Sequence, residues 1–166
     1  VVAGDSITIT GTAGDVTIGG TLTAAVATVG VTAGQVVTVG AAILAATDAT
    51  VTSTNADAAI NAAMTATAGI ATVLAAENVS STAAGDVAGD SVVITGTAGN
   101  VTLSGTVLAD TTTVAITSGQ ATTLNDDVTA TTTVTVTAGT DITVAAGAPV
   151  VGPTGITGTA GRDISL

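Results

Sequence analysis

The chain has 166 residues, and its one basic and twelve acidic side chains give a formal net charge of −11. A single cation, Arg162, excludes a nucleic-acid-binding surface, because phosphate contacts need clustered Lys and Arg. The chain has no His, Cys, Phe, Tyr or Trp, which removes the usual catalytic bases, nucleophiles and zinc ligands, so we expect no enzyme, no catalytic residues and no small-molecule substrate.

Short runs of Val, Ile and Thr recur along the chain, each after a Gly that belongs to an Ala-Gly or Ser-Gly pair. In chain order these runs are Val16–Ile18, Val36–Val39, Val101–Leu103, Asp141–Val144 and Asp163–Leu166. β-branched residues favour strands, and the alternation of Thr and Val in Thr133–Thr137 predicts one hydroxyl face and one apolar face. The sequence therefore predicts many short strands, spaced about 10 residues apart.

One segment, residues 55–80, departs from this pattern because it is poor in Val and rich in Ala. Ala favours helices and Asn55 is a suitable helix cap, so a short helix is one interpretation. The other is an irregular coil with small side chains. We expect an irregular Ala-rich segment inside a single repetitive domain that spans residues 1–166.

An internal duplication organises the rest of the chain. Residues 2–54 align without a gap with residues 87–139, and 27 of the 53 aligned pairs are identical. The best-matched stretch sets AGDSITITGTAGDVTIGGT against AGDSVVITGTAGNVTLSGT. Repetition of this kind is typical of proteins built from stacked structural units.

Two all-β architectures fit short, evenly spaced strands: a parallel β-solenoid with about 20 residues per coil, and an antiparallel β-sandwich. Residues of one kind that recur at a fixed interval stack on themselves in a solenoid. A sandwich core is about 10 Å thick and usually recruits aromatic side chains, which this chain lacks. We therefore favour the solenoid, with about eight coils and a length of about 40 Å.

Asp126 and Asp127, with Asn125, are candidate Ca²⁺ ligands, because hard cations prefer oxygen donors. No EF-hand spacing surrounds them. The alternative is a solvated turn without a metal, in which case the chain needs no cofactor.

Thr131, Thr133, Thr135 and Thr137 form a row of hydroxyl side chains. On a flat solenoid such a row would suit an ice-binding plane. The alternative is an ordinary soluble Thr face.

The two ends of the chain carry candidate contacts between subunits. Strand-like residues occur at once at Val1 and Val2 and again at Ile164 and Leu166, so neither end is expected to have a polar cap. Uncapped coil ends expose open ladder edges, and head-to-tail stacking of copies would cover them and build a filament. Arg162 is expected either to pair with an acid across this joint or to form a local salt bridge.

The units GTAGDVTI and TAGTDITV resemble the β-strand-repeat exoproteins of bacteria, including filamentous-haemagglutinin-like adhesins and surface-layer proteins. The resemblance implies a right-handed β-helix, export, and an extracellular or cell-surface scaffold role. The sequence contains no run of 18 apolar residues, so we expect no membrane-spanning segment. We expect a secreted structural protein that self-assembles into a filament or surface layer, with itself as partner; an adhesin stalk fragment or an ice-binding solenoid is the alternative.

Overall fold

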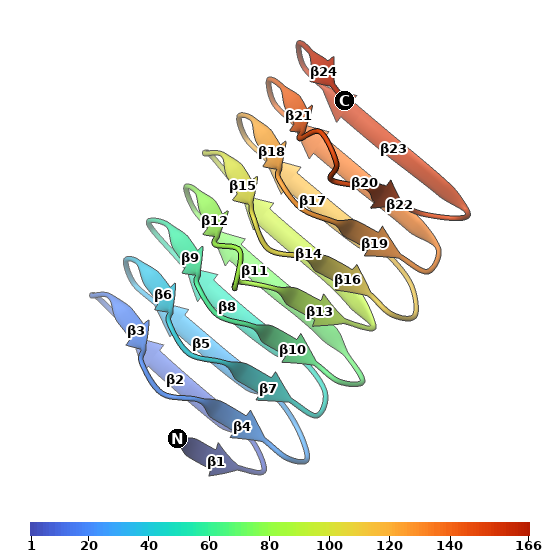
Figure 1. The fold of residues 1–166 in the computed structure, drawn as a ribbon. Coiled ribbons are helices and arrows are strands. Elements are labelled where there is room, and N and C mark those ends of the chain that lie inside the picture. The colour runs from blue at the N-terminus through green and yellow to red at the C-terminus, as the bar shows by residue number, and fades with distance from the viewer.

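The computed structural model describes residues 1–166 and consists of strands and turns without a helix. The chain winds into a rod in which each coil lies on the one before it (Figure 1). Its strands form three sheets of eight strands, and all pairings are parallel. This arrangement is the predicted β-solenoid, with about eight turns of roughly 21 residues, and it excludes the antiparallel sandwich.

Each coil contributes one strand to each sheet. Sheet A contains β1 (Val2–Gly4), β4 (Leu22–Ala24), β7 (Ile43–Ala45), β10 (Met64–Ala66), β13 (Val87–Gly89), β16 (Val107–Ala109), β19 (Val128–Ala130) and β22 (Val150–Val151). Sheet B contains β2 (Ile7–Gly11), β5 (Val29–Ala33), β8 (Ala49–Ser53), β11 (Ile70–Ala75), β14 (Ser91–Gly96), β17 (Val114–Ser118), β20 (Thr133–Ala138) and β23 (Gly155–Ala160). Sheet C contains β3 (Val16–Ile18), β6 (Val37–Val39), β9 (Ala58–Ile60), β12 (Val79–Ser81), β15 (Val101–Leu103), β18 (Thr122–Leu124), β21 (Ile142–Val144) and β24 (Ile164–Ser165). We number the coils 1 to 8, so that coil 1 is β1–β3 and coil 8 is β22–β24.

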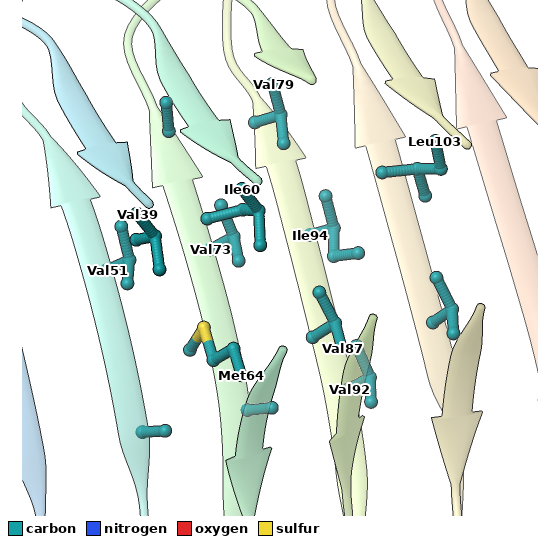
Figure 2. Packing of buried hydrophobic residues seen from close by; sticks show 14 of the residues in the cluster. Val39, Val51, Ile60, Met64, Val73, Val79, Val87, Val92, Ile94 and Leu103 are labelled. Carbon is teal, nitrogen blue, oxygen red and sulfur yellow. The ribbon is translucent and has the colours of Figure 1, made fainter. Parts of the chain in front are cut away.

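The interior is a narrow column of aliphatic side chains that stack on residues of the same kind. In sheet B, Val51 pairs with Val73 and Val73 with Ile94, and all three are fully buried. Figure 2 shows these side chains pointing into the interior, which they share with side chains of sheets A and C. Burying an aliphatic side chain of this size contributes about 1.5–3 kcal/mol, so the column stabilises the rod without any aromatic residue.

The two duplicated segments, residues 2–54 and 87–139, are offset by four coils. Val2 begins β1 and its counterpart Val87 begins β13, and both strands belong to sheet A. Coil 5 is therefore the structural repeat of coil 1. Coils 1–4 and coils 5–8 are thus the two halves of the rod, and coil 8 is the last coil of the second half as coil 4 is of the first.

Residues 55–80 are not irregular or helical, as the sequence suggested, but form the strands β9 to β12. Ala58 pairs with Val37 on one side and Val79 on the other, and Ala71 lies between Ala49 and Val92. Both Ala side chains are fully buried. The packing of neighbouring coils thus overrides the helix propensity of Ala.

The turns between sheets B and C bring backbones of successive coils into close contact. A Cβ atom built at Gly139 would overlap the carbonyl group of Gly119, and one built at Gly161 would overlap that of Gly139. Glycine is required at these positions because only hydrogen fits between the stacked turns.

Candidate functional surfaces

The two end coils expose residues whose equivalents are buried elsewhere in the rod. Val2 is 51% exposed, whereas its neighbour in the ladder, Leu22, is 2% exposed. Ile164 is 50% exposed, and the Ile142 on which it stacks is buried. The structure therefore places the predicted contact residues Val1 and Val2 at one end of the rod and Ile164 and Leu166 at the other (Figure 1).

The end formed by coil 8 is hollow. An apolar cavity of about 270 Å³ opens there, and its walls include Val136, Ile142, Ile156 and Ile164. Its origin is Gly158, which pairs with Val136 in a ladder position that carries Val or Ile in every other coil. The missing side chain leaves the core of the last coil unfilled.

The opposite end carries a side chain where the hollow end lacks one. Ile9 of β2 occupies in coil 1 the inward position that Gly158 occupies in coil 8. It is only partly buried and packs against the core from one side. The two ends of the rod thus have complementary shapes at this position.

All twelve acidic residues and Arg162 lie in turns, and no strand contains a charged side chain. The charge is therefore concentrated at the corners of the coils. The outer faces of the three sheets are neutral.

Arg162 forms the local salt bridge that was one of the two expected arrangements. Its guanidinium donates hydrogen bonds to Asp141 of the preceding coil, and its Nε lies 3.8 Å from a carboxylate oxygen of Asp163. The bond to Arg162 lowers the pKa of Asp141 below its usual value, and the bond to Asp141 raises the pKa of Arg162. The only cation of the chain thus lies beside two carboxylates that occupy the same corner of successive coils.

The same corner holds an amide and carboxylate ladder that sequence reasoning missed. Asp57 Oδ1 accepts a hydrogen bond from the backbone N–H of Asn78 at 2.9 Å, and Asn78 Oδ1 accepts one from the N–H of Asn100 at 2.8 Å. Asp141 Oδ1 accepts in the same way from Asp163 N–H at 3.3 Å. The spacing of these residues by one coil is the signal that could have revealed the ladder.

Asp126 and Asp127 lie in the turn between β18 and β19. The backbone N–H of Asp127 donates to Asp126 Oδ1 at 2.8 Å, and Asn125 Nδ2 donates to Ser104 Oγ at 3.2 Å. The structure brings no third acidic side chain to this pair, since it contains no group of three or more His, Cys, Asp or Glu suited to a metal. Calcium binding at this turn stays a prediction.

The hydroxyl row expected at Thr131–Thr137 does not form one plane. Thr131 and Thr132 lie in a turn and donate hydrogen bonds to backbone carbonyls of the previous coil. Thr135 and Thr137 do point outward from sheet B, where they pair with Thr157 and Thr159 of the next strand. The array therefore runs across the strands, and reading Thr along a single strand could not identify it.

The chain has no helix of sufficient length and hydrophobicity to cross a lipid bilayer. Comparison with known protein families, curated proteins and solved structures finds no match.

Proposed function

We propose that this chain is an extracellular or cell-surface structural protein whose copies stack head to tail into a filament or surface layer. The observation that carries the proposal is the complementarity of the two ends. Ile9 in coil 1 occupies the inward ladder position that lacks a side chain at Gly158 in coil 8, where the hollow opens. Stacking coil 1 of a second copy on coil 8 would place an isoleucine side chain over the hollow and bury both apolar surfaces.

The junction between coils 4 and 5 indicates the register of such a joint. There Met64 pairs with Val87, Ala71 with Val92 and Val79 with Val101, and coil 5 is the repeat of coil 1. By the same register, Val150 would pair with Val2 of the next copy. Ile156 would then pair with Ile7, and Ile164 with Val16.

Backbone hydrogen bonds support the same arrangement. The strands β22 to β24 form one edge of each sheet and β1 to β3 the other. Edge strands present unpaired N–H and C=O groups that readily pair with another chain. Because the two edges lie at opposite ends of the rod, the contact is heterologous, and such a contact extends into an open fibre unless a rotation closes it.

The corner ladder adds an electrostatic condition. In the proposed joint, Asp163 would accept a hydrogen bond from the backbone N–H of Asp15 of the next copy, as Asp141 does from Asp163. Two carboxylates would then lie about one strand spacing, ~4.8 Å, apart. Like charges at this distance repel, so we expect added salt, which screens them, to strengthen assembly.

Cysteine cross-linking tests the register directly, because the chain has no cysteine of its own. The double variant Val2→Cys/Val150→Cys should form disulfide-linked ladders of many copies, since paired positions lie within the 4.4–6.8 Å Cα separation of a disulfide. In the control Ala3→Cys/Val150→Cys, the first cysteine points outward and should not cross-link. The two cysteines of one molecule lie at opposite ends of the rod, so an internal disulfide does not compete.

Electron microscopy tests the filament itself. We expect fibres with an axial repeat of about 38 Å, eight coils of ~4.8 Å. Gly158→Trp fills the hollow and should abolish the fibres, whereas Thr157→Trp, one residue away and outward-facing, should preserve them. Wild-type particles that stay single at high concentration and in high salt would refute the proposal.

A further inference from the structure

Sheet B carries an array of threonine side chains on its outer surface. Its strands have five or six residues, whereas those of sheets A and C have two or three, so two outward positions per strand form two columns along the rod. We call these residues the threonine face: Thr8, Thr50, Thr72, Thr135 and Thr157 in one column, and Thr10, Thr32, Thr52, Thr95, Thr117, Thr137 and Thr159 in the other. Threonine thus occupies seven of the eight positions in the second column and five of eight in the first.

The hydroxyl groups of the threonine face have no hydrogen-bond partner within the protein. Hydroxyls in the turns behave differently, since those of Thr54, Thr112 and Thr132 all donate to backbone carbonyls of a neighbouring coil. Every face hydroxyl is therefore available as both donor and acceptor. No charged side chain stands among them, because all charges lie in the turns.

The spacing of these hydroxyls follows from strand geometry. Neighbouring strands lie about 4.7–4.9 Å apart, and alternate residues of one strand lie about 6.6–6.8 Å apart. A water molecule that bonds two oxygens at about 2.8 Å, in tetrahedral directions, holds those oxygens about 4.6 Å apart. The columns therefore place oxygens close to the second-neighbour spacing of a tetrahedral water network, the arrangement found in ice.

We propose that the threonine face binds the surface of ice crystals. Its strands run side by side along the whole rod (Figure 1), so seven strand spacings give columns about 34 Å long. Such a column can hold an ordered row of bridging waters.

The amino-acid composition argues against binding of this face to other regular surfaces, such as polysaccharides or anionic surfaces. Sugar surfaces are usually recognised by aromatic stacking, and the chain has no aromatic residue. Anionic surfaces need clustered cations, and the single Arg162 lies at a corner of coil 8. A neutral hydroxyl array is suited to a neutral hydroxyl lattice, and water supplies it.

Leu74 interrupts the second column, and Gly30, Val93 and Ala115 interrupt the first. The interruptions in the first column at Val93 and Ala115 are consecutive, so the second column is the more continuous. The decisive substitutions therefore belong in the second column.

Thermal hysteresis of the wild-type chain, measured with a single ice crystal, tests the proposal. We expect the wild-type chain to hold the freezing point below the melting point. The gap between the two temperatures should shrink when outward threonines of the face are replaced. Thr52→Tyr/Thr95→Tyr places two bulky rings on the second column and should remove most of the hysteresis. The matched control, Thr38→Tyr/Thr102→Tyr, places the same rings on the outer surface of sheet C and should retain it.

Far-UV circular dichroism verifies that both double variants keep the strand content of the wild type. If either fails to fold, the single variants Thr52→Tyr and Thr38→Tyr replace them. Absence of hysteresis in the folded wild type, or equal loss in both variants, would overturn the proposal. The inference does not depend on filament formation: Gly158→Trp, which blocks the joint, should keep the hysteresis.

Discussion

Truncating one buried side chain in the middle of the rod should lower the free energy of unfolding much more than the same truncation at the end of the rod. Ile94 is fully buried in β14, where it stacks between Val73 and Ile116. Ile94→Ala removes three carbon atoms, worth about 0.8 kcal/mol each in transfer free energy. The adjacent coils limit collapse of the cavity, so the free energy of unfolding should fall by about 3–4 kcal/mol, within the usual range for such changes.

The matched variant is Ile156→Ala in β23. Ile156 is 55% exposed, so about half of its transfer free energy is realised and no closed cavity forms. The loss should be about 1 kcal/mol. Under conditions in which copies stack, the proposed joint buries Ile156 and this cost should rise toward that of Ile94→Ala.

Urea unfolding followed by far-UV circular dichroism measures both variants. Intrinsic fluorescence is of no use because the chain has no Trp or Tyr. Because each coil contacts only its neighbours, unfolding can proceed coil by coil, so urea midpoints are compared only where the m-values agree. Equal losses for Ile94→Ala and Ile156→Ala in single particles would refute the assignment of the core to the interior coils.

Two further predictions concern the turns. Gly139→Ala should lower the thermal midpoint because its Cβ would overlap the carbonyl of Gly119, whereas Gly19→Ala, which has open space around the new methyl group, should change it little; equal midpoints by calorimetry would contradict the stacked-turn explanation. Arg162→Gln should also lower the midpoint near neutral pH. The salt bridge lowers the pKa of Asp141, so its stabilisation is present above the usual carboxyl pKa and is lost as the pH falls through the lowered pKa of the folded state; a midpoint difference from the wild type that persists in strong acid would argue against this linkage.

The coil architecture was predictable because the residues that define it repeat. Turn glycines and the Val and Thr runs recur at the coil period, and the structure stacks them as expected, with Val31 on Val51 and Val51 on Val73. The Ala-rich segment was misjudged because the small size of Ala58 and Ala71 says nothing about the residues that stack on them in neighbouring coils, among them Val37 and Val92. Only the register between coils reveals that these small side chains fill core positions.

The end surfaces and the threonine face differ in how much of them the sequence predicted. Exposure of Val2 and Ile164 was expected from their positions near the ends of the chain. The hollow was not expected, because a missing side chain at Gly158 matters only if the residues that stack with Gly158 in the other coils fill the core. Likewise, Thr8, Thr50 and Thr135 are separated by 42 and 85 residues in the sequence. Knowing that they share a column requires the register of every intervening coil.

The linear order of the coils has a consequence for how the molecule loses structure. An interior coil is held by a partner on each side, and an end coil by one, so opening should begin at coils 1 and 8 and move inward. Amide hydrogen exchange would then be slowest around β11 and β14 and progressively faster toward β1 and β24. A protease would shorten such a rod from its tips, leaving the middle as the last part to be digested.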